Sequence, residues 1–271
     1  MDRIGIEFIT GHGMDPVAFV HLAADLGVSR IGLALSPILL VPESALRWSM
    51  RDDAALHRAV KTALSERSVS VMLGEGFLIR PSVEIADSAH DLDLLAELGA
   101  ERANMVSIDP DTMRAHDQFA HFAAMASERG MRPTIEYMPA MPIGTLAAAF
   151  ACVEASGNGD AGVLIDAMHF FRSGGTIAEL QAFDPARIGH VQICDVPWES
   201  AFASYGEEAK CERLAPGDGD LPLAEFIAAL PRDLPLGIEV PQQSRDLAGV
   251  DPHERVSTVV VATRTFTTGL L

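Results

Sequence analysis

The chain has 271 residues, 48% of them hydrophobic, and its 20 basic and 38 acidic residues give a formal net charge of −18. This charge repels nucleic-acid phosphates, so we expect no nucleic-acid partner. No apolar run reaches the roughly 18 residues that suggest a membrane span. The three cysteines form no CxxC pair and the N-terminus has no basic region with a cleavage site, so we expect a cytoplasmic protein without a membrane partner.

Short apolar segments alternate with longer amphipathic segments along the whole chain. The short segments are mostly continuous in apolar residues, as in parallel strands that are covered on both faces. They predict strands over residues 4–9, 30–35, 69–73, 102–107, 133–137, 162–165, 190–194 and 236–240.

The longer segments have the pattern and the end signals of helices. They predict helices over residues 16–26, 52–67, 82–98, 111–129, 145–155, 176–183, 221–230 and 252–266. Asp15 and Asp251 each stand before a proline, which suits a helix N-cap followed by the first helical position. Gly27, Gly99 and Gly130 each follow a predicted helix, as C-cap glycines do.

Eight strand–helix units in one continuous alternation predict an α/β fold, a single (β/α)8 TIM barrel domain over residues 1–271. The alternative is an open doubly wound sheet, which usually carries a GxGxxG turn after its first strand. The sequence there is Thr10-Gly11-His12-Gly13, which lacks that spacing. The connection over residues 196–221 is unusually long, and long loops at a barrel mouth commonly cover a substrate.

Four of the later predicted strands carry a polar side chain near the C-terminal end. They are Glu136, Asp166, Gln192 and Glu239. A carboxylate in an apolar run is tolerated when it is paired or binds a metal, and like charges at one barrel mouth repel unless a cation lies between them. The four oxygen donors predict one divalent metal ion, Mn²⁺ or Mg²⁺. Zn²⁺ or Co²⁺ fits less well, because both prefer more nitrogen or sulfur ligands.

At these residues the chain resembles the xylose isomerase-like TIM barrels, also called the sugar phosphate isomerase/epimerase or AP-endonuclease-2 superfamily. The motifs are Ile135-Glu136, Asp166-Ala167-Met168-His169, Val191-Gln192-Ile193-Cys194-Asp195, Arg213-Leu214-Ala215-Pro216-Gly217-Asp218-Gly219 and Ile238-Glu239-Val240-Pro241. The resemblance implies that Glu136, Asp166, Gln192 and Glu239 bind the metal and that His169 contacts the substrate or metal-bound water. Gln192 in its context is similar to the hydroxypyruvate isomerase branch, whereas other branches have histidine there.

The resemblance implies a metal-dependent isomerase or epimerase of a small keto-sugar or hydroxy-keto acid. Glu136 and Glu239 would act as acid and base through a cis-enediolate. A second reading is a lyase, in which the same intermediate loses a β-hydroxyl from a keto-polyol or dehydroshikimate-like substrate. A third is a metal-free binding barrel, which the four intact ligand residues disfavour. The partner is a small-molecule substrate, and a homodimer or a homotetramer is left open.

Several residues near the strand ends are further candidates. Arg213 is placed to bind a substrate carboxylate or phosphate, since a guanidinium binds such groups in a bidentate manner. Asp195 is expected to orient Gln192 from behind the ligand shell. Three residues around the first and third strands are expected to line the substrate cavity: Glu7, His12 and Glu75.

Overall fold

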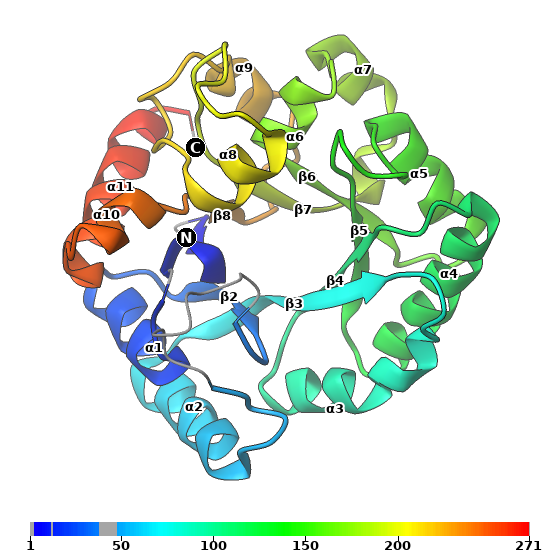
Figure 1. Ribbon diagram of the computed structural model, residues 1–271, viewed down its shortest axis with the longest axis horizontal. Helices are drawn as coiled ribbons and strands as arrows, with labels where there is room; N and C mark the ends of the chain where they lie inside the picture. Colours follow the sequence, from blue (N-terminus) through cyan, green and yellow to red (C-terminus); the bar gives the residue numbers. More distant parts are fainter. Residues whose placement is uncertain (1–2, 12, 38–47, 271) are drawn as a thin grey trace.

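The computed structural model describes residues 3–11, 13–37 and 48–270. Over these residues the strands close into one parallel barrel in the order β1 to β8 (Figure 1). Ile4 of β1 lies opposite Leu236 of β8, which closes the barrel. The strands are β1 (Ile4–Ile6), β2 (Arg30–Ala34), β3 (Ser70–Ile79), β4 (Arg102–Ser107), β5 (Arg132–Glu136), β6 (Gly162–Asp166), β7 (Ile188–Ile193) and β8 (Leu236–Ile238). The predicted (β/α)8 TIM barrel is therefore confirmed.

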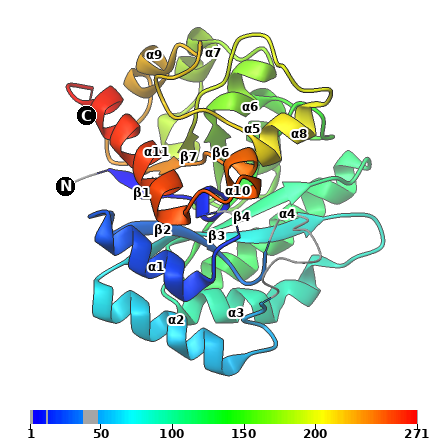
Figure 2. The ribbon, with the colours of Figure 1, turned by 60° about the vertical axis from the view of Figure 1, so that its left-hand side comes forward.

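The helices form a ring around the barrel, as Figures 1 and 2 show from two directions. They are α1 (Pro16–Asp25), α2 (Ala54–Arg67), α3 (Ala89–Glu97), α4 (Thr112–Glu128), α5 (Leu146–Ala155), α6 (Ala167–Arg172), α7 (Ile177–Ala182), α8 (Tyr205–Cys211), α9 (Leu223–Ala228), α10 (Gln243–Leu247) and α11 (Pro252–Thr267). Short 3-10 helices are η1 (Phe8–Gly11), η2 (Ile85–Ser88) and η3 (Pro185–Arg187). Within the described ranges no helix is long and apolar enough to cross a membrane.

The structure contains the side-chain caps from which the starts of two helices were predicted. Asp15 accepts hydrogen bonds from the backbone amides of Val17 and Ala18, and Pro16 occupies the first helical position. Asp251 caps α11 in the same way. The short helices α6, α8 and α10 were not predicted, and α8 lies nearer the barrel axis than the outer ring (Figure 1).

Strand β3 is longer than the sequence predicts, and this changes the position of Glu75. We expected the strand to end at residue 73, just before Gly74-Glu75-Gly76. Instead, the pairing with β4 shifts between Gly74 and Phe77, and the strand resumes after Gly76, whose φ is 102°. A positive φ of this size suits glycine, which has no Cβ. Glu75 therefore lies within the strand and is 7% exposed.

Asp195 fixes the base of the long loop that follows β7. Its Oδ1 accepts hydrogen bonds from the amides of Val196 and Leu221 at 2.9 and 3.1 Å, and its Oδ2 accepts one from Gly217 at 3.0 Å. We expected Asp195 to orient Gln192, and the structure corrects this assignment. Because side chains alternate along a strand, residues 192 and 195 leave the backbone in opposite directions, and Asp195 meets the loop instead.

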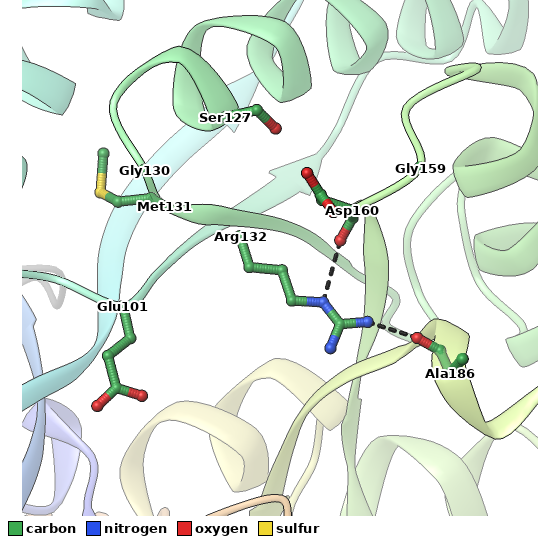
Figure 3. Close-up of a pocket in the computed structure, with 8 residues that line it drawn as sticks. All are labelled: Glu101, Ser127, Gly130, Met131, Arg132, Gly159, Asp160 and Ala186. Atoms are coloured by element: carbon green, nitrogen blue, oxygen red, sulfur yellow. Dashed lines mark hydrogen bonds between the residues drawn. The ribbon is translucent and has the colours of Figure 1, made fainter.

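The opposite end of the barrel is closed by arginines that hydrogen-bond to carbonyl groups. Arg132, at the start of β5, donates to the carbonyls of Asp160 and Ala186 at 3.0 and 2.6 Å (Figure 3). A cavity of about 450 Å³ lies around it and is also lined by Glu101 and Met131. Burial lowers the pKa of Arg132. Since active sites of TIM barrels lie at the C-terminal ends of the strands, we assign this cavity to the structural end of the barrel.

Replacing Asp195 by alanine should destabilise the protein by about 2–4 kcal/mol, because three backbone amides lose their acceptor in a buried environment. The measurement is the free energy of unfolding in urea. The matched control is Asp117→Ala on the exposed side of α4, which should change that free energy by about 0.5 kcal/mol or less. Equal losses for the two variants would show that Asp195 does not hold the loop.

Candidate active site

The four predicted ligand residues lie together at the C-terminal end of the barrel. Glu136 ends β5, Asp166 ends β6, Gln192 is the penultimate residue of β7, and Glu239 follows β8 directly. Asp166 lies opposite Gln192 in the pairing of β6 with β7. The Glu239 amide donates to the carbonyl of Ile193, which continues the pairing of β7 with β8. All four are buried, with exposed fractions of 8, 0, 1 and 7%.

Arg213 occupies the centre of this group. Its Nη1 donates at 2.8 Å to Asp166 Oδ2 and at 2.8 Å to Glu239 Oε2, and its Nε donates to the carbonyl of Ala209 at 2.8 Å. The side chain is buried, although it comes from the long loop. Arg213 therefore lies in the site as predicted, but in this structure its contacts are with the carboxylates of the barrel.

His169 joins two of the carboxylates, and its position follows from a helix cap. Asp166 is the N-cap of α6 and accepts a hydrogen bond from the His169 amide at 2.8 Å. A residue three positions after an N-cap lies beside the capping side chain. The imidazole accordingly lies between Asp166 Oδ1, 3.2 Å from Nδ1, and Glu136 Oε1, 3.3 Å from Nε2. The spacing of aspartate and histidine in the motif thus has a local structural cause.

Two residues of the site were missed by sequence analysis. Asn104 of β4 donates from Nδ2 to Glu136 Oε2 at 2.8 Å and accepts at Oδ1 from the Thr134 hydroxyl at 2.9 Å. A polar side chain in an apolar strand was the available signal. Tyr205 of α8 contacts Nδ1 of His169 through its hydroxyl. It lies in the long loop, where its sequence context carries no comparable signal.

A second layer of polar side chains lies in the barrel interior. Gln192 donates from Nε2 to Glu75 Oε1 at 3.3 Å, and Nε2 of His190 lies 2.6 Å from Oε1 of Glu7. Oε1 of Gln192 is buried and has no hydrogen-bond partner among the residues that the structure describes. Glu75 and Glu7, expected to line the cavity, are thus placed inside the barrel. His12, the third residue of that expectation, lies outside the described residues.

The pKa values of the two carboxyl groups that contact Arg213 are shifted in opposite directions. Burial raises the pKa of Glu239 well above its ordinary range; Arg213 opposes this shift, while the charge of Asp166 adds to it. Burial also works against ionisation of Asp166, but the charges of Arg213 and His169 outweigh it and lower its pKa. Carboxyl groups whose pKa values are driven apart are typical of acid–base pairs in active sites.

The oxygen atoms of the four predicted ligand residues suit a divalent cation, but they are not arranged around a common centre. In the part of the chain that the structure describes, no three His, Cys, Asp or Glu side chains are arranged to hold a metal ion. Nη1 of Arg213 instead lies between Asp166 and Glu239. The unpartnered, buried Oε1 of Gln192 is the observation that favours a ligand here, because buried polar atoms normally have a partner.

Replacing Arg213 by methionine should destabilise the metal-free protein by about 3–5 kcal/mol, because two buried carboxylates lose their counter-ion. The measurement is urea unfolding at pH 7.5 with a chelator. Arg245→Met is the matched control, since the Arg245–Glu254 pair lies at the surface, with a half-buried arginine and an exposed glutamate, and such pairs contribute about 1 kcal/mol or less. If both variants lost the same free energy, Arg213 would not be the counter-ion of the site.

Stability should also depend on pH through Glu75. Burial raises its pKa well above the ordinary value of 4.5, and the charges of Glu7, Glu239 and Glu136 add to the shift. A carboxyl group with a raised pKa in the folded state stabilises the fold fully below pH 4.5, and this contribution is lost as the pH rises toward the raised pKa.

Glu75→Gln removes that loss, so the chelated variant should gain stability over wild type between pH 5 and pH 8. By pH 8 the gain in the free energy of unfolding should exceed about 0.5 kcal/mol, the usual range of neutral surface changes. Glu66→Gln, on the exposed face of α2, should stay within that range at both pH values. A gain that does not grow with pH would contradict the prediction.

Comparison with known proteins was made for the whole chain. A family model described as the xylose isomerase-like TIM barrel matches residues 20–257. Sequence comparison with curated proteins finds no match. Among solved structures, the IolI protein with a bound zinc atom superposes with a TM-score of 0.81 at 15% identity, over 100% of this chain and 99% of that one.

Two further structures have the same fold. D-psicose 3-epimerase from Clostridium cellulolyticum H10, solved with D-tagatose, has a TM-score of 0.73 at 14% identity and covers 98% of this chain and 99% of its own. The probable 3-DHS dehydratase AsbF from Bacillus anthracis has a TM-score of 0.70 at 11% identity, with 96% and 99% covered. At such identities the likeness shows the fold, whereas the family model covers most of the sequence. The chain belongs to the family of xylose isomerase-like TIM barrels.

Proposed function

We propose that this chain is a divalent-metal-dependent isomerase or epimerase of a small keto-sugar or hydroxy-keto acid. One observation carries the proposal: Glu136 and Glu239 lie on either side of Asp166 and Gln192 at the barrel mouth, and Oε1 of Gln192 is buried without a partner within the described part of the chain. Two carboxyl groups beside a group of oxygen donors are what proton transfer next to a carbonyl requires.

The proposed cation is Mn²⁺ or Mg²⁺, held by Glu136, Asp166, Gln192 and Glu239. Its charge is needed because five carboxyl groups gather here and Arg213 supplies a single positive charge; they are Glu7, Glu75, Glu136, Asp166 and Glu239. When bound, the cation would polarise the substrate carbonyl and the neighbouring hydroxyl, which acidifies the C–H bond between them. The IolI structure, which has the same fold and is described with a bound zinc atom, supports a metal ion in this protein.

The protein's own side chains supply the proton transfers. One glutamate removes the proton from the carbon beside the carbonyl and gives a cis-enediolate; the other returns a proton to the adjacent carbon or to the opposite face. Glu136 is oriented for this by Asn104 and His169, and Glu239 by Arg213. The raised pKa of Glu239 suits a group that takes up and releases a proton during the reaction.

Arg213 and Tyr205 are proposed to bind and enclose the substrate. The guanidinium contacts of Arg213 use Nε and Nη1, which leaves Nη2 for a carboxylate or phosphate group of the substrate. Tyr205 brings α8 over His169, so this helix is placed to exclude water from the cavity. Closure of a loop over the site protects an enediolate from side reactions.

A dehydratase is the second candidate. In that reaction the enediolate expels the β-hydroxyl group, which leaves as water after taking a proton from an acid. The structural likeness to the probable 3-DHS dehydratase AsbF favours it, and so does the absence of a carboxylate in the sequence Ala140-Met141-Pro142-Ile143, where epimerases of the family often have one. A product that absorbs as an enone or a diketone would distinguish the lyase from the isomerase.

The direct test is metal analysis of the purified protein, followed by a screen of small aldoses, ketoses and keto acids in heavy water. An isomerase or epimerase should incorporate deuterium at the carbon beside the carbonyl as substrate is converted. A protein that binds no divalent metal and exchanges no substrate proton would refute the proposal.

Replacing Glu239 by glutamine should lower kcat by about 10²–10⁴-fold, because the amide cannot carry the transferred proton. Metal binding should weaken but persist, since the amide keeps one oxygen donor. Turnover and metal affinity are measured on the same preparation. Glu225→Gln, exposed on α9, is the control and should leave both unchanged; a near-normal kcat for Glu239→Gln would remove it from the acid–base pair.

A further inference from the structure

Helices α6 and α8 lie side by side at the barrel mouth and contact each other through two pairs of side chains (Figures 1 and 2). His169 and Arg172 are one turn apart on α6, and Tyr205 and Glu208 are one turn apart on α8. Residues at this spacing lie on the same face of a helix. The Tyr205 hydroxyl contacts Nδ1 of His169, while Arg172 Nη2 donates to Glu208 Oε1 at 2.9 Å. The two pairs together fix how α8 lies along α6.

The guanidinium of Arg172 also binds the chain that leads to α8. Nη1 donates to the carbonyl of Trp198 at 2.5 Å, and Nη2 donates to the carbonyl of Pro197 at 2.7 Å. Beyond the other end of α8, Glu212 accepts hydrogen bonds from the amide and the hydroxyl of Ser244 at 3.0 and 2.6 Å. The segment is thus attached to α6 by Arg172 and to α10 by the residue that follows α8.

Stability alone does not account for the ion pair between Arg172 and Glu208. Glu208 is 1% exposed, and within residues 3–11, 13–37 and 48–270 neither its Oε2 nor Nε of Arg172 has a hydrogen-bond partner. Burial of charged groups with unsatisfied atoms costs free energy, and apolar side chains of similar size often stabilise a fold as well or better. An ion pair with a hydrogen bond has a preferred direction, however, so it favours one arrangement of the two helices.

The arrangement of α8 determines the position of two groups at the candidate active site. Tyr205, at the start of the helix, contacts His169. Ala209 follows Glu208 directly, and its carbonyl accepts a hydrogen bond from Arg213 Nε at 2.8 Å. Because α8 has only seven residues, a displacement of Glu208 would move the Tyr205 side chain and the Ala209 carbonyl together.

We propose that Arg172 and Glu208 are positioning residues whose ion pair holds α8 with Tyr205 against His169. The inference rests on the proposed function, in which Tyr205 and Arg213 bind and enclose the substrate. It adds to that function the contact that keeps this side of the cavity in place. Arg172 and Glu208 act on the reaction through Tyr205 and the Ala209 carbonyl.

The first test measures the contact between Tyr205 and His169 by NMR of ¹⁵N-labelled histidine rings, in chelated protein without substrate. The signal of His169 is assigned from its absence in His169→Gln, and Tyr205→Phe shows where it lies when the contact is lost. Arg172→Met should move the signal toward its position in Tyr205→Phe. Lys210→Met removes a cation from the exposed face of α8 and should leave the signal unchanged.

Circular dichroism checks that each variant folds. If Arg172→Met does not fold, Arg172→Lys takes its place and should move the signal in the same direction, since lysine lacks the planar fork that contacts Glu208 and two carbonyls at once. An unmoved His169 signal, or an equal movement in Lys210→Met, would overturn the positioning role.

The second test is a double-mutant cycle on kcat/KM with the substrate found by the screen in heavy water. Arg172→Met should lower kcat/KM by about 10–100-fold, because displaced groups at a site lose their alignment with the substrate. In a Tyr205→Phe background the same change should cost less, and the two losses should differ by more than about twofold, the limit of additive behaviour. Equal losses would show that Arg172 does not act through Tyr205.

The two tests separate the positioning role from the proposed function. The NMR measurement needs neither metal nor substrate, so an unmoved signal contradicts the positioning role whatever reaction the protein catalyses. A protein that binds no divalent metal and converts no substrate would refute the proposed function, while the measured contact between α6 and α8 would stand.

Discussion

Repulsion among buried carboxyl groups is the constraint on which the rest of the site depends. Glu7, Glu75, Glu136, Asp166 and Glu239 influence one another across the barrel, and water is not available to screen them at exposed fractions of 8% or less. The surrounding residues divide this charge: a guanidinium lies between Asp166 and Glu239, an amide and an imidazole contact Glu136, and an imidazole contacts Glu7. This arrangement gives neighbouring carboxyl groups different affinities for a proton.

The barrel and the strand-end residues could be predicted because their signals are local. Continuous apolar runs mark buried parallel strands, and a carboxylate at the end of such a run contrasts with its neighbours. Asp166 also caps α6 and thereby brings His169 to the site. The three-residue spacing between them therefore predicts the location of both side chains. The agreement between the predicted and observed ends of the strand over Arg102–Ser107 has the same basis.

The remaining features depend on contacts between distant parts of the chain. Glu75 meets Gln192 across the barrel over a separation of 117 residues, and the strand that carries it continues past residue 73, where the sequence predicts its end. Arg213 could be assigned to the site from its motif, but its partners could not, since they depend on how the loop folds back over β6 and β8. The contact of Tyr205 with His169 also depends on how this loop folds. The contacts of Asp195 could not be predicted, because they depend on the direction in which its side chain leaves the end of the strand.

The hydrogen bonds that hold both ends of the long loop at Asp195 have an evolutionary consequence. Both ends of the segment over residues 197–216 are fixed to one carboxylate, so the stretches of it that do not carry Tyr205 and Arg213 can change in length and composition without disturbing the register of β7. Lengthening a loop between fixed ends costs little free energy, about 0.6 kcal/mol for each doubling. These stretches can therefore diverge while Arg213 and Tyr205 stay in place, and homologous enzymes that keep the same site residues can acquire new substrate preferences by changing them.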